Sequence, residues 1–251
     1  MSGHSKWATT KYRKGAQDKA RAKLFAKLIR QIEVAAREGG GDLNANANLR
    51  TAYAKARDGS VPMDTIERAI KRGTGELEGV KYDAISYEGY GPNGVAVIVE
   101  CLSDNRNRTG SEIKTIFSRN SGAMAEPGSV SWQFSRKAVV LFETNQTEEE
   151  VLDQLLECNV EDLTYKDGSF KTLGEPGSLH EIVNVVNNNN WTLISAENEL
   201  VPSQQVALED ITEVKKVFKL LETLDEHDDV QNVYDNAFVA DSILKELEDQ
   251  V

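Results

Sequence analysis

The chain of 251 residues has few of the residues from which common catalytic and metal sites are built. Its two cysteines, Cys101 and Cys158, provide neither a disulfide framework nor a CxxC metal site, and their apolar surroundings are typical of buried free thiols. The three histidines, His4, His180 and His227, share no metal-ligand spacing. GxSxG and HExxH motifs are also missing. We therefore expect no catalytic residues, no metal and no cofactor.

Long apolar runs are missing as well. No stretch of about 18 apolar residues is present, so we expect no membrane-spanning helix and no membrane partner. The first residues are charged and lack the apolar core of a secretory signal. Free thiols fit a reducing compartment, which makes the cytoplasm the expected location. A hydrophobic fraction of 39% with 28% charged residues is typical of a globular protein of about two domains.

The charge is unevenly distributed along the chain, whose formal net charge is −12. Residues 1–80 carry 16 bases and 9 acids (+7), so residues 81–251 carry 13 bases and 32 acids (−19). Residues 3–37 alone hold ten bases and two acids, a net charge of +8. A local basic field attracts polyanions whatever the total charge, whereas the acidic remainder repels a phosphate backbone. Any nucleic acid is therefore expected to bind through the N-terminal third.

The first 79 residues predict a small helical domain. Residues 1–16 show no apolar period and are expected to form a flexible arm. Three helical patterns follow, each ended by glycine: from about residue 17 to Gly39, from 46 to Gly59, and from Pro62 to Gly73. Each helix is expected to be too short to be stable alone in water, so the three helices must pack together. This predicts a basic helical domain, residues 1–79, with an N-terminal arm.

Strand signals begin after residue 80. The turn residues 91–94 predict a hairpin over 82–102, followed by a helix from Asp104 and a strand in which Val130, Trp132 and Phe134 alternate. One helix covers such a sheet poorly, so a helix and strand at 210–236 are expected to complete it. The predicted domain is discontinuous: residues 80–135 plus 205–251.

The middle of the chain, residues 136–204, predicts a second and inserted α+β domain. Its elements are a strand at 139–142, a helix with the capping box Thr147 and Glu150, a hairpin at 163–172, a helix with the capping box Ser178 and Glu181, and a strand at 191–200. The fold class predicted for the whole chain is α+β and multi-domain. A three-helix N-terminal domain is followed by two α+β domains, one inserted in the other.

Several motifs, spread over nearly the whole chain, resemble the YebC/PmpR family. They are Gly3-His4-Ser5-Lys6-Trp7, Ile66-Glu67-Arg68-Ala69-Ile70-Lys71, Tyr87-Glu88-Gly89-Tyr90-Gly91-Pro92, Ser103-Asp104-Asn105-Arg106-Asn107-Arg108-Thr109 and Asp228-Asp229-Val230-Gln231-Asn232-Val233-Tyr234. The resemblance implies a helical domain followed by two α+β domains, one inserted in the other. It also implies a regulator of gene expression, because members are described as DNA-binding transcriptional regulators. Others, including a mitochondrial relative, resemble translation factors that act on the ribosome.

The candidate site is a set of cations that contact phosphate, together with one aromatic residue. The N-terminal members are Lys6, Lys11, Arg13, Lys14, Lys19, Arg21, Lys23, Lys27 and Arg30, with Trp7 placed to stack on unpaired bases. Lys71 and Arg72 either extend this surface or compensate the dipole at a helix C-terminus. Arg106 and Arg108 stand at a helix N-terminus, where the dipole disfavours cations; they bind either a nucleic-acid backbone or the acidic body.

Three functions fit this pattern. The first is a non-enzymatic, DNA-binding regulator of transcription, as the family description implies. The second is a translation factor that binds ribosomal RNA or tRNA and relieves slow peptide-bond formation, which the absence of a clear helix-turn-helix favours. The third is a metal-dependent nuclease that uses Asp225, Glu226, Asp228 and Asp229, although such a run of acids is more often solvated surface. The acidic domains are expected to position the basic domain or to contact a protein partner.

Overall fold

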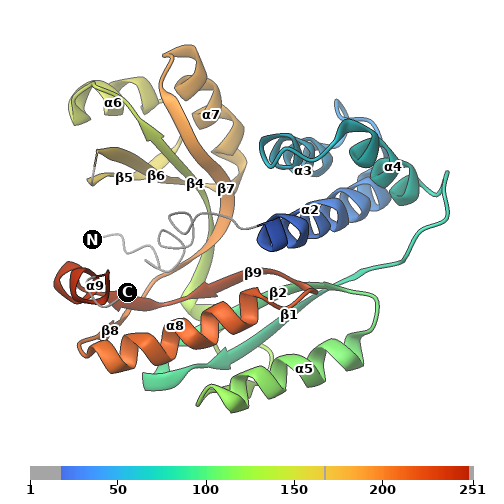
Figure 1. Ribbon diagram of the computed structural model, residues 1–251. Coiled ribbons are helices and arrows are strands. Elements are labelled where there is room, and N and C mark those ends of the chain that lie inside the picture. The colour runs from blue at the N-terminus through green and yellow to red at the C-terminus, as the bar shows by residue number, and fades with distance from the viewer. Residues whose placement is uncertain (1–17, 167, 249–251) are drawn as a thin grey trace. The chain divides into compact units, whose positions relative to one another are not determined.

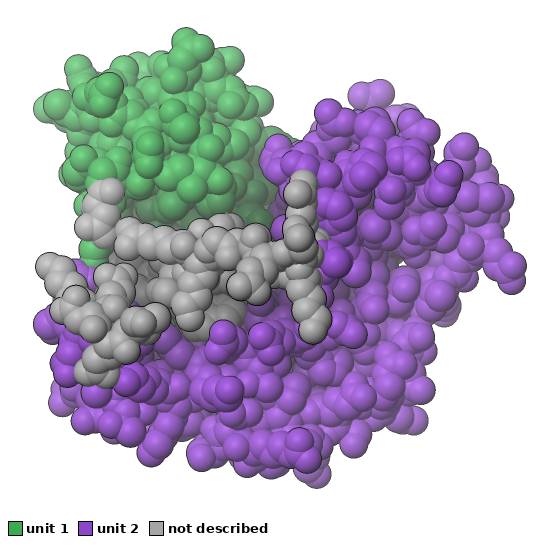
Figure 2. Space-filling model, in the orientation of Figure 1, with its two compact units in different colours: residues 1–4, 132–205 green, residues 5–131, 206–251 purple. Residues whose placement is uncertain are grey.

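The computed structural model describes residues 18–166 and 168–248, which belong to two compact units (Figure 2). We call residues 132–205 the middle unit. The outer unit consists of residues 18–131 together with 206–248, so the chain leaves it and later returns to it. The protein is of the α+β class, with a helical N-terminal part followed by parts that contain β-sheets.

The outer unit begins with three helices: α2 (Asp18–Gly39), α3 (Ala47–Asp58) and α4 (Met63–Thr74). In this three-helix module both α3 and α4 pack against α2 (Figure 1). Its core includes Leu28 and Ile32 of α2, Leu49 of α3 and Ile66 of α4. The predicted apolar stripe of α2 is therefore confirmed over most of its length. No helix in the described ranges is long and apolar enough to cross a membrane.

Gly73 has a different role from the one predicted. It lies inside α4, which ends one residue before Gly75, the left-handed C-cap with φ of +85°. A Cβ atom on Gly73 would lie 2.5 Å from the backbone oxygen of Glu33 and 2.6 Å from the Cβ of Ala36. Glycine is needed here because α2 and α4 approach closely, and its position near a helix end concealed that role.

The rest of the outer unit is built on a four-stranded antiparallel sheet with the order β3-β1-β2-β9. The strands are β1 (Asp83–Tyr90), β2 (Ala96–Ser103), β3 (Ala123–Ala125) and β9 (Val230–Asp235). Helices α5 (Arg106–Arg119) and α8 (Ile211–Asp225) cover one face (Figure 1), where the valines of β2 contact Ile113, Phe117 and Leu220. The turn η1 (Pro92–Gly94) closes the predicted hairpin.

Four short elements of the outer unit were not predicted, and the first of them is the three-residue strand β3. Strands β8 (Val206–Leu208) and β10 (Ala237–Val239) form a small parallel pair, and helix α9 (Asp241–Glu248) follows them. Each strand has only three residues, too few for a period to show in the sequence.

The strand predicted around Val130–Phe134 begins later than its apolar alternation indicates. Residues 131–133 form the turn η2 (Ser131–Gln133), and Trp132 is 67% exposed. The buried Glu88 carboxylate explains this difference, because it accepts hydrogen bonds from the backbone N–H groups of Gly128, Val130 and Ser131 at 2.7–2.9 Å. Burial alone would raise the pKa of Glu88, but these bonds outweigh it and lower that pKa. Residues 128–131 are therefore held in a loop conformation by Glu88, and the strand starts only after η2.

The middle unit has a four-stranded antiparallel sheet with the order β5-β6-β4-β7. In chain order its elements are β4 (Phe134–Glu143), α6 (Glu148–Leu155), β5 (Val160–Lys166), β6 (Ser169–Gly174), η3 (Pro176–Ser178), α7 (Leu179–Asn188) and β7 (Thr192–Pro202). This βαββαβ succession is a split βαβ arrangement. Both helices pack on one sheet face, over a core in which Phe142 stacks on Phe170 and Trp191.

One of the two predicted capping boxes is present. Thr147 and Glu150 exchange side-chain-to-backbone hydrogen bonds at the start of α6, as predicted. The prediction for Ser178 and Glu181 was wrong. Ser178 belongs to η3, and its hydroxyl donates to the Glu175 carbonyl at 2.8 Å. The preceding tight turn places the Ser178 backbone in the helical region, where its side chain does not cap α7.

We predict that Gly73→Ala destabilises the outer unit. Its methyl group must displace the backbone of α2, and overpacking of this kind costs about 1–3 kcal/mol. The matched control is Gly177→Ala, where a Cβ atom meets nothing within 4 Å and the expected change is within about 0.5 kcal/mol. The free energy of unfolding, measured by urea denaturation, distinguishes the two. Equal stability of both variants would contradict the close-approach role.

Candidate nucleic-acid interface

Seven of the predicted site residues belong to the N-terminal end of the chain. Lys6, Trp7, Lys11, Arg13 and Lys14 lie outside the described residues. The backbone of Lys19 and Arg21 lies in the first turn of α2, and the described side chains begin at Ala22. Their role in phosphate binding therefore stays a prediction.

Three further cations, Lys23, Lys27 and Arg30, form a stripe along one side of α2, which we call the cationic stripe. The stripe contacts residues 225–229, which are the last residue of α8 and the four residues that lead to β9; they are called the acidic loop below. The Lys23 ammonium donates to the Glu226 carbonyl at 2.8 Å. Lys27 donates to the backbone carbonyl of Asp225 at 2.8 Å and to its carboxylate at 3.2 Å. Two stretches about 200 residues apart in the chain are thus in direct contact.

Arg30 lies at the inner end of the stripe and makes the densest set of contacts. One guanidinium nitrogen donates to the Asp228 carbonyl at 2.8 Å and to the Asp229 carboxylate at 2.9 Å. Its guanidinium also lies over the ring of Tyr82, 5.1 Å from the centroid, which adds a cation–π interaction. Arg30 is therefore held on several sides within the outer unit.

Asp229 is the meeting point of this network. It is 3% exposed, and its second carboxylate oxygen accepts hydrogen bonds from the Thr109 hydroxyl at 2.6 Å and from Arg108 at 3.0 Å. Ser103 supports this arrangement, with its hydroxyl 2.6 Å from that of Thr109. Burial alone would raise the pKa of Asp229, but the bonds from Thr109, Arg108 and Arg30 outweigh it and lower the pKa.

The two arginines at the start of α5 have different surroundings. Arg108 donates to Asp104 at 2.8 Å and to Asp229. Of the two alternatives given for this residue, the structure therefore contains the salt bridge to acidic residues of the body. Those carboxylates raise the pKa of Arg108. Arg106 is exposed, and within the described ranges its side chain makes no hydrogen bond or ion pair; its backbone carbonyl accepts from the Tyr87 hydroxyl. Of the two, Arg106 is the more accessible cation.

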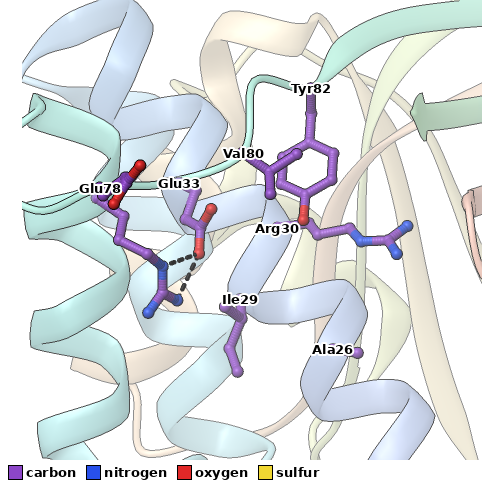
Figure 3. A pocket seen from close by; sticks show the side chains of 9 residues that line it. Ala26, Ile29, Arg30, Glu33, Glu78, Val80 and Tyr82 are labelled. Atoms are coloured by element: carbon purple, nitrogen blue, oxygen red, sulfur yellow. Dashed lines mark hydrogen bonds and ion pairs between the residues drawn. The ribbon is translucent and has the colours of Figure 1, made fainter. Parts of the chain in front are cut away.

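Lys71 and Arg72 also differ. Arg72 donates from two nitrogens to the buried Glu33 carboxylate, at 2.6 and 2.5 Å, so it fastens α4 to α2 (Figure 3). Lys71 is exposed, and its side chain makes no ion pair among the described residues. A hollow of about 440 Å³ lies beside the Arg72–Glu33 pair. It is lined by Ala26, Ile29, Arg30, Glu33, Arg72, Glu78, Gly79, Val80 and Tyr82.

The acidic loop is more than the solvated surface that its composition predicts. Asp229 is buried and Asp225 is half-buried, because both neutralise cations of α2. His227 braces the loop: its Nδ1 accepts from the Asp229 N–H at 3.2 Å, so its Nε2 donates to Glu112 at 2.8 Å. Across the described part of the chain, no group of three or more His, Cys, Asp or Glu residues is arranged to hold a metal ion.

Helices α3 and α4 are joined by four residues, the connection length of a helix-turn-helix. In that motif the first residues of the second helix contact base edges. The exposed residues in the first two turns of α4 are Met63, Asp64, Glu67 and Arg68, and Arg68 lies near Asp64 at 3.9 Å. Two acids at this position would lie in the negative potential of the phosphates on both sides of the groove, so the start of α4 is electrostatically unsuited to enter a major groove.

In the middle unit, strands β4 and β7 carry no aromatic residue for stacking bases on the described face opposite α6 and α7. The face opposite α6 and α7 carries Lys137, Val139 and Leu141 of β4, and their partners on β7 are Glu199, Glu197 and Ser195. RNA-binding sheets of similar topology stack bases on aromatic residues, which these positions lack. Lys137 is also neutralised, since its ammonium lies 2.6 Å from the Glu161 carboxylate.

The cation–acid pairing was missed when the sequence was read along the chain. Both partners were identified, one as a phosphate-binding helix and the other as an acidic run. Their opposite charges are the only sequence signal that links them. Because the two stretches are about 200 residues apart, this signal does not indicate which cation pairs with which acid.

Comparison with known proteins places the chain among a well-populated group. A family model described as the TACO1/YebC protein N-terminal domain matches residues 5–76, and one described as the TACO1/YebC second and third domain matches residues 82–237. A relative from Halothermothrix orenii is 45% identical over 253 residues, and one from Mycobacterium ulcerans is 50% identical over 252 residues. Both alignments cover 100% of each chain, and both relatives are named probable transcriptional regulatory protein.

A solved structure has the same fold. The crystal structure of a conserved hypothetical protein from Aquifex aeolicus superposes with a TM-score of 0.81 at 39% sequence identity. The match covers 90% of this chain and 94% of that one.

We predict that Asp229→Asn destabilises the outer unit by roughly 3 kcal/mol, the lower end of the range for breaking a buried ion pair. The pKa of Asp229 is lowered in the folded state. The ionised carboxylate therefore contributes fully to the free energy of unfolding at a pH above the unfolded-state pKa of about 3.9, and this contribution is lost as the pH falls through the folded-state pKa. Thermal unfolding between pH 3 and 7 should show this acid-dependent component in the parent protein and not in the variant.

The matched control is Asp228→Asn. Its carboxylate is 76% exposed and lies 3.9 Å from Lys23, so the expected change in stability is within about 0.5 kcal/mol. Similar losses in both variants would contradict the central role of Asp229.

Proposed function

The chain belongs to the TACO1/YebC family, and from this membership and its charge distribution we propose that it is a non-enzymatic regulator of gene expression that binds nucleic acid. The observation that carries the proposal is the excess of eight positive charges over residues 3–37 of a chain whose net charge is −12. Lysine and arginine that contact phosphate supply most of the affinity in nucleic-acid complexes. The first contacts are assigned to Lys6, Lys11, Arg13, Lys14, Lys19 and Arg21, with Trp7 stacking on a base.

Two exposed cations of the outer unit extend this set. Lys71, at the end of α4, and Arg106, at the start of α5, are free of ion pairs within the described ranges. By contrast, Arg72 and Arg108 fasten helices inside the unit, and their role is to hold the interface in shape.

The names of the relatives favour DNA as the ligand and transcription as the regulated step. On this reading the protein binds duplex DNA near promoters. Phosphate contacts would position it, and specificity would come from the shape of the DNA more than from a base-reading helix.

The acids at the start of α4 favour a second candidate, a translation factor that binds ribosomal RNA or tRNA. Asp64 and Glu67 oppose the docking of α4 in a major groove, whereas recognition of folded RNA relies on backbone, shape and unpaired bases. A basic arm with one tryptophan suits a crevice lined with phosphates. In this role the protein would ease slow peptide-bond formation, and any effects on transcription would be indirect.

Ultraviolet crosslinking in cells, followed by sequencing of the bound RNA and DNA, tests the two candidates together. Crosslinks concentrated on ribosomal RNA or tRNA would support the translation factor. Crosslinks at discrete promoter sites, with ribosomal RNA at background, would support the transcriptional regulator and contradict the ribosomal one. Background crosslinking to both nucleic acids would contradict the proposed function.

We predict that reversing two arm charges, Lys11→Glu with Lys14→Glu, weakens binding and reduces its salt dependence. Each lost phosphate contact lowers the slope of log K against log salt concentration by about 0.9 on duplex DNA and about 0.7 on single strands. The double variant should therefore lose between about 1.4 and 1.8 units of slope. Titration of labelled duplex DNA and folded RNA from 50 to 200 mM salt measures this.

The matched control reverses two exposed lysines of α8, Lys216→Glu with Lys219→Glu, which changes the net charge equally. Its salt slope should stay that of the parent protein. Equal slopes for the parent protein and both variants would contradict the assignment of the arm to the nucleic-acid interface.

A further inference from the structure

We propose that the acidic loop is a built-in competitor for the cationic stripe of α2. A nucleic-acid backbone then reaches Lys23 and Lys27 only when the tip of the loop, residues 225–228, leaves them. This inference rests on the nucleic-acid-binding function proposed above and adds its regulation.

The first argument is chemical, because the loop offers the stripe the kind of oxygen atoms that a phosphate backbone offers. Lys23 and Lys27 each donate to a carbonyl oxygen at 2.8 Å, and Lys27 also donates to the Asp225 carboxylate at 3.2 Å. These carbonyls belong to the last residue and the C-cap of α8, where the helix dipole adds negative potential. The loop and a polyanion therefore occupy the same donors and exclude one another.

The second argument is that the side-chain ion pairs of the stripe weaken from Asp225 toward Asp228. Lys23 and Asp228 are 3.9 Å apart with both side chains exposed, a geometry that contributes little in water. Lys27 and Asp225 are closer and less exposed. Asp229 is held separately by Arg108 and Thr109 of α5, so it stays anchored in the outer unit when the tip moves. Release of the tip therefore breaks the bond from Arg30 to the Asp228 carbonyl and keeps the bonds of Arg108 and Thr109 to Asp229.

The third argument concerns charge balance. The lysines of the stripe belong to the most basic stretch of the chain, and the structure neutralises them with one of its most acidic stretches. A weak polyanion does not displace several contacts made within one chain, whereas a dense phosphate array does. The loop thus favours ligands that engage the arm and the stripe together.

The test compares the full chain with the variant Asp225→Asn/Asp228→Asn. Its affinity for a labelled folded RNA and a labelled duplex DNA, measured by fluorescence anisotropy at 100 mM salt, should rise about fivefold, because the exposed Lys23–Asp228 pair and the less exposed Lys27–Asp225 pair no longer favour the closed loop. The control Glu148→Gln/Glu149→Gln changes the net charge equally at exposed positions of α6. It should change affinity less than twofold. An equal rise in both variants would reduce the effect to overall charge and overturn the proposal.

A second comparison locates the gain on the stripe. Lys23→Gln/Lys27→Gln should abolish the fivefold gain when it is combined with the loop variant. If the combined variant keeps the gain, the stripe is not the released surface and the proposal is wrong.

Hydrogen exchange of the unmodified protein provides a readout that is independent of affinity. The backbone amides of Asp229 and Val230 are bonded to His227 in the closed loop. Peptides spanning 225–230 should exchange faster when the oligonucleotide is bound. Slower exchange there would show that the loop stays docked and would overturn the proposal.

The outcomes separate this inference from the function on which it rests. If parent and loop variant bind equally well, the competition is wrong and nucleic-acid binding stands. If neither binds RNA or DNA even at 50 mM salt, the proposed function fails, and the competition fails with it.

Discussion

A buried carboxylate must be paired or it destabilises the fold, and in this protein that constraint applies at Asp229. Its two oxygens are bonded by Arg30 of α2 and by Arg108 and Thr109 of α5, while Asp229 itself directly precedes β9. The three-helix module is therefore fastened to the sheet of the outer unit by electrostatics more than by an extended apolar core. Other contacts of α2 with the acidic loop depend on where this carboxylate lies.

The same network divides the cations of the chain into two groups. Arg30, Arg72 and Arg108 face carboxylates that are nearly buried, so they hold helices in place. Lys71 and Arg106 stand exposed. Lys23 and Lys27 lie between these extremes, and each donates a hydrogen bond to a carbonyl oxygen at the end of α8. Because a phosphate offers the same kind of oxygen acceptor, structural pairing and the proposed nucleic-acid binding are compatible on one helix.

Local rules predicted much of the fold, and they failed where a distant group intervened. The stripe of α2, the hairpin of β1 and β2, and the capping box at Thr147 follow from spacing within a few residues, so they were found. Trp132 looked like part of a strand, but Glu88 from β1 takes the backbone N–H groups next to it. Gly73 looked like a helix end, but the close approach of α2 requires it. In both cases the deciding atom lies about 40 residues away.

The sequence by itself determined the α+β class, the family and the position of the basic stretch, because periodicity, motifs and charge are properties of neighbouring residues. Tertiary structure alone decided which cations are neutralised. Coulomb energy depends on distance in space and on burial, and neither is encoded in separation along the chain. Lys27 and Asp225 are 198 positions apart and 3.2 Å from each other. For that reason the acidic loop, which composition alone predicts to be solvated surface, became the partner of the helix expected to bind phosphate.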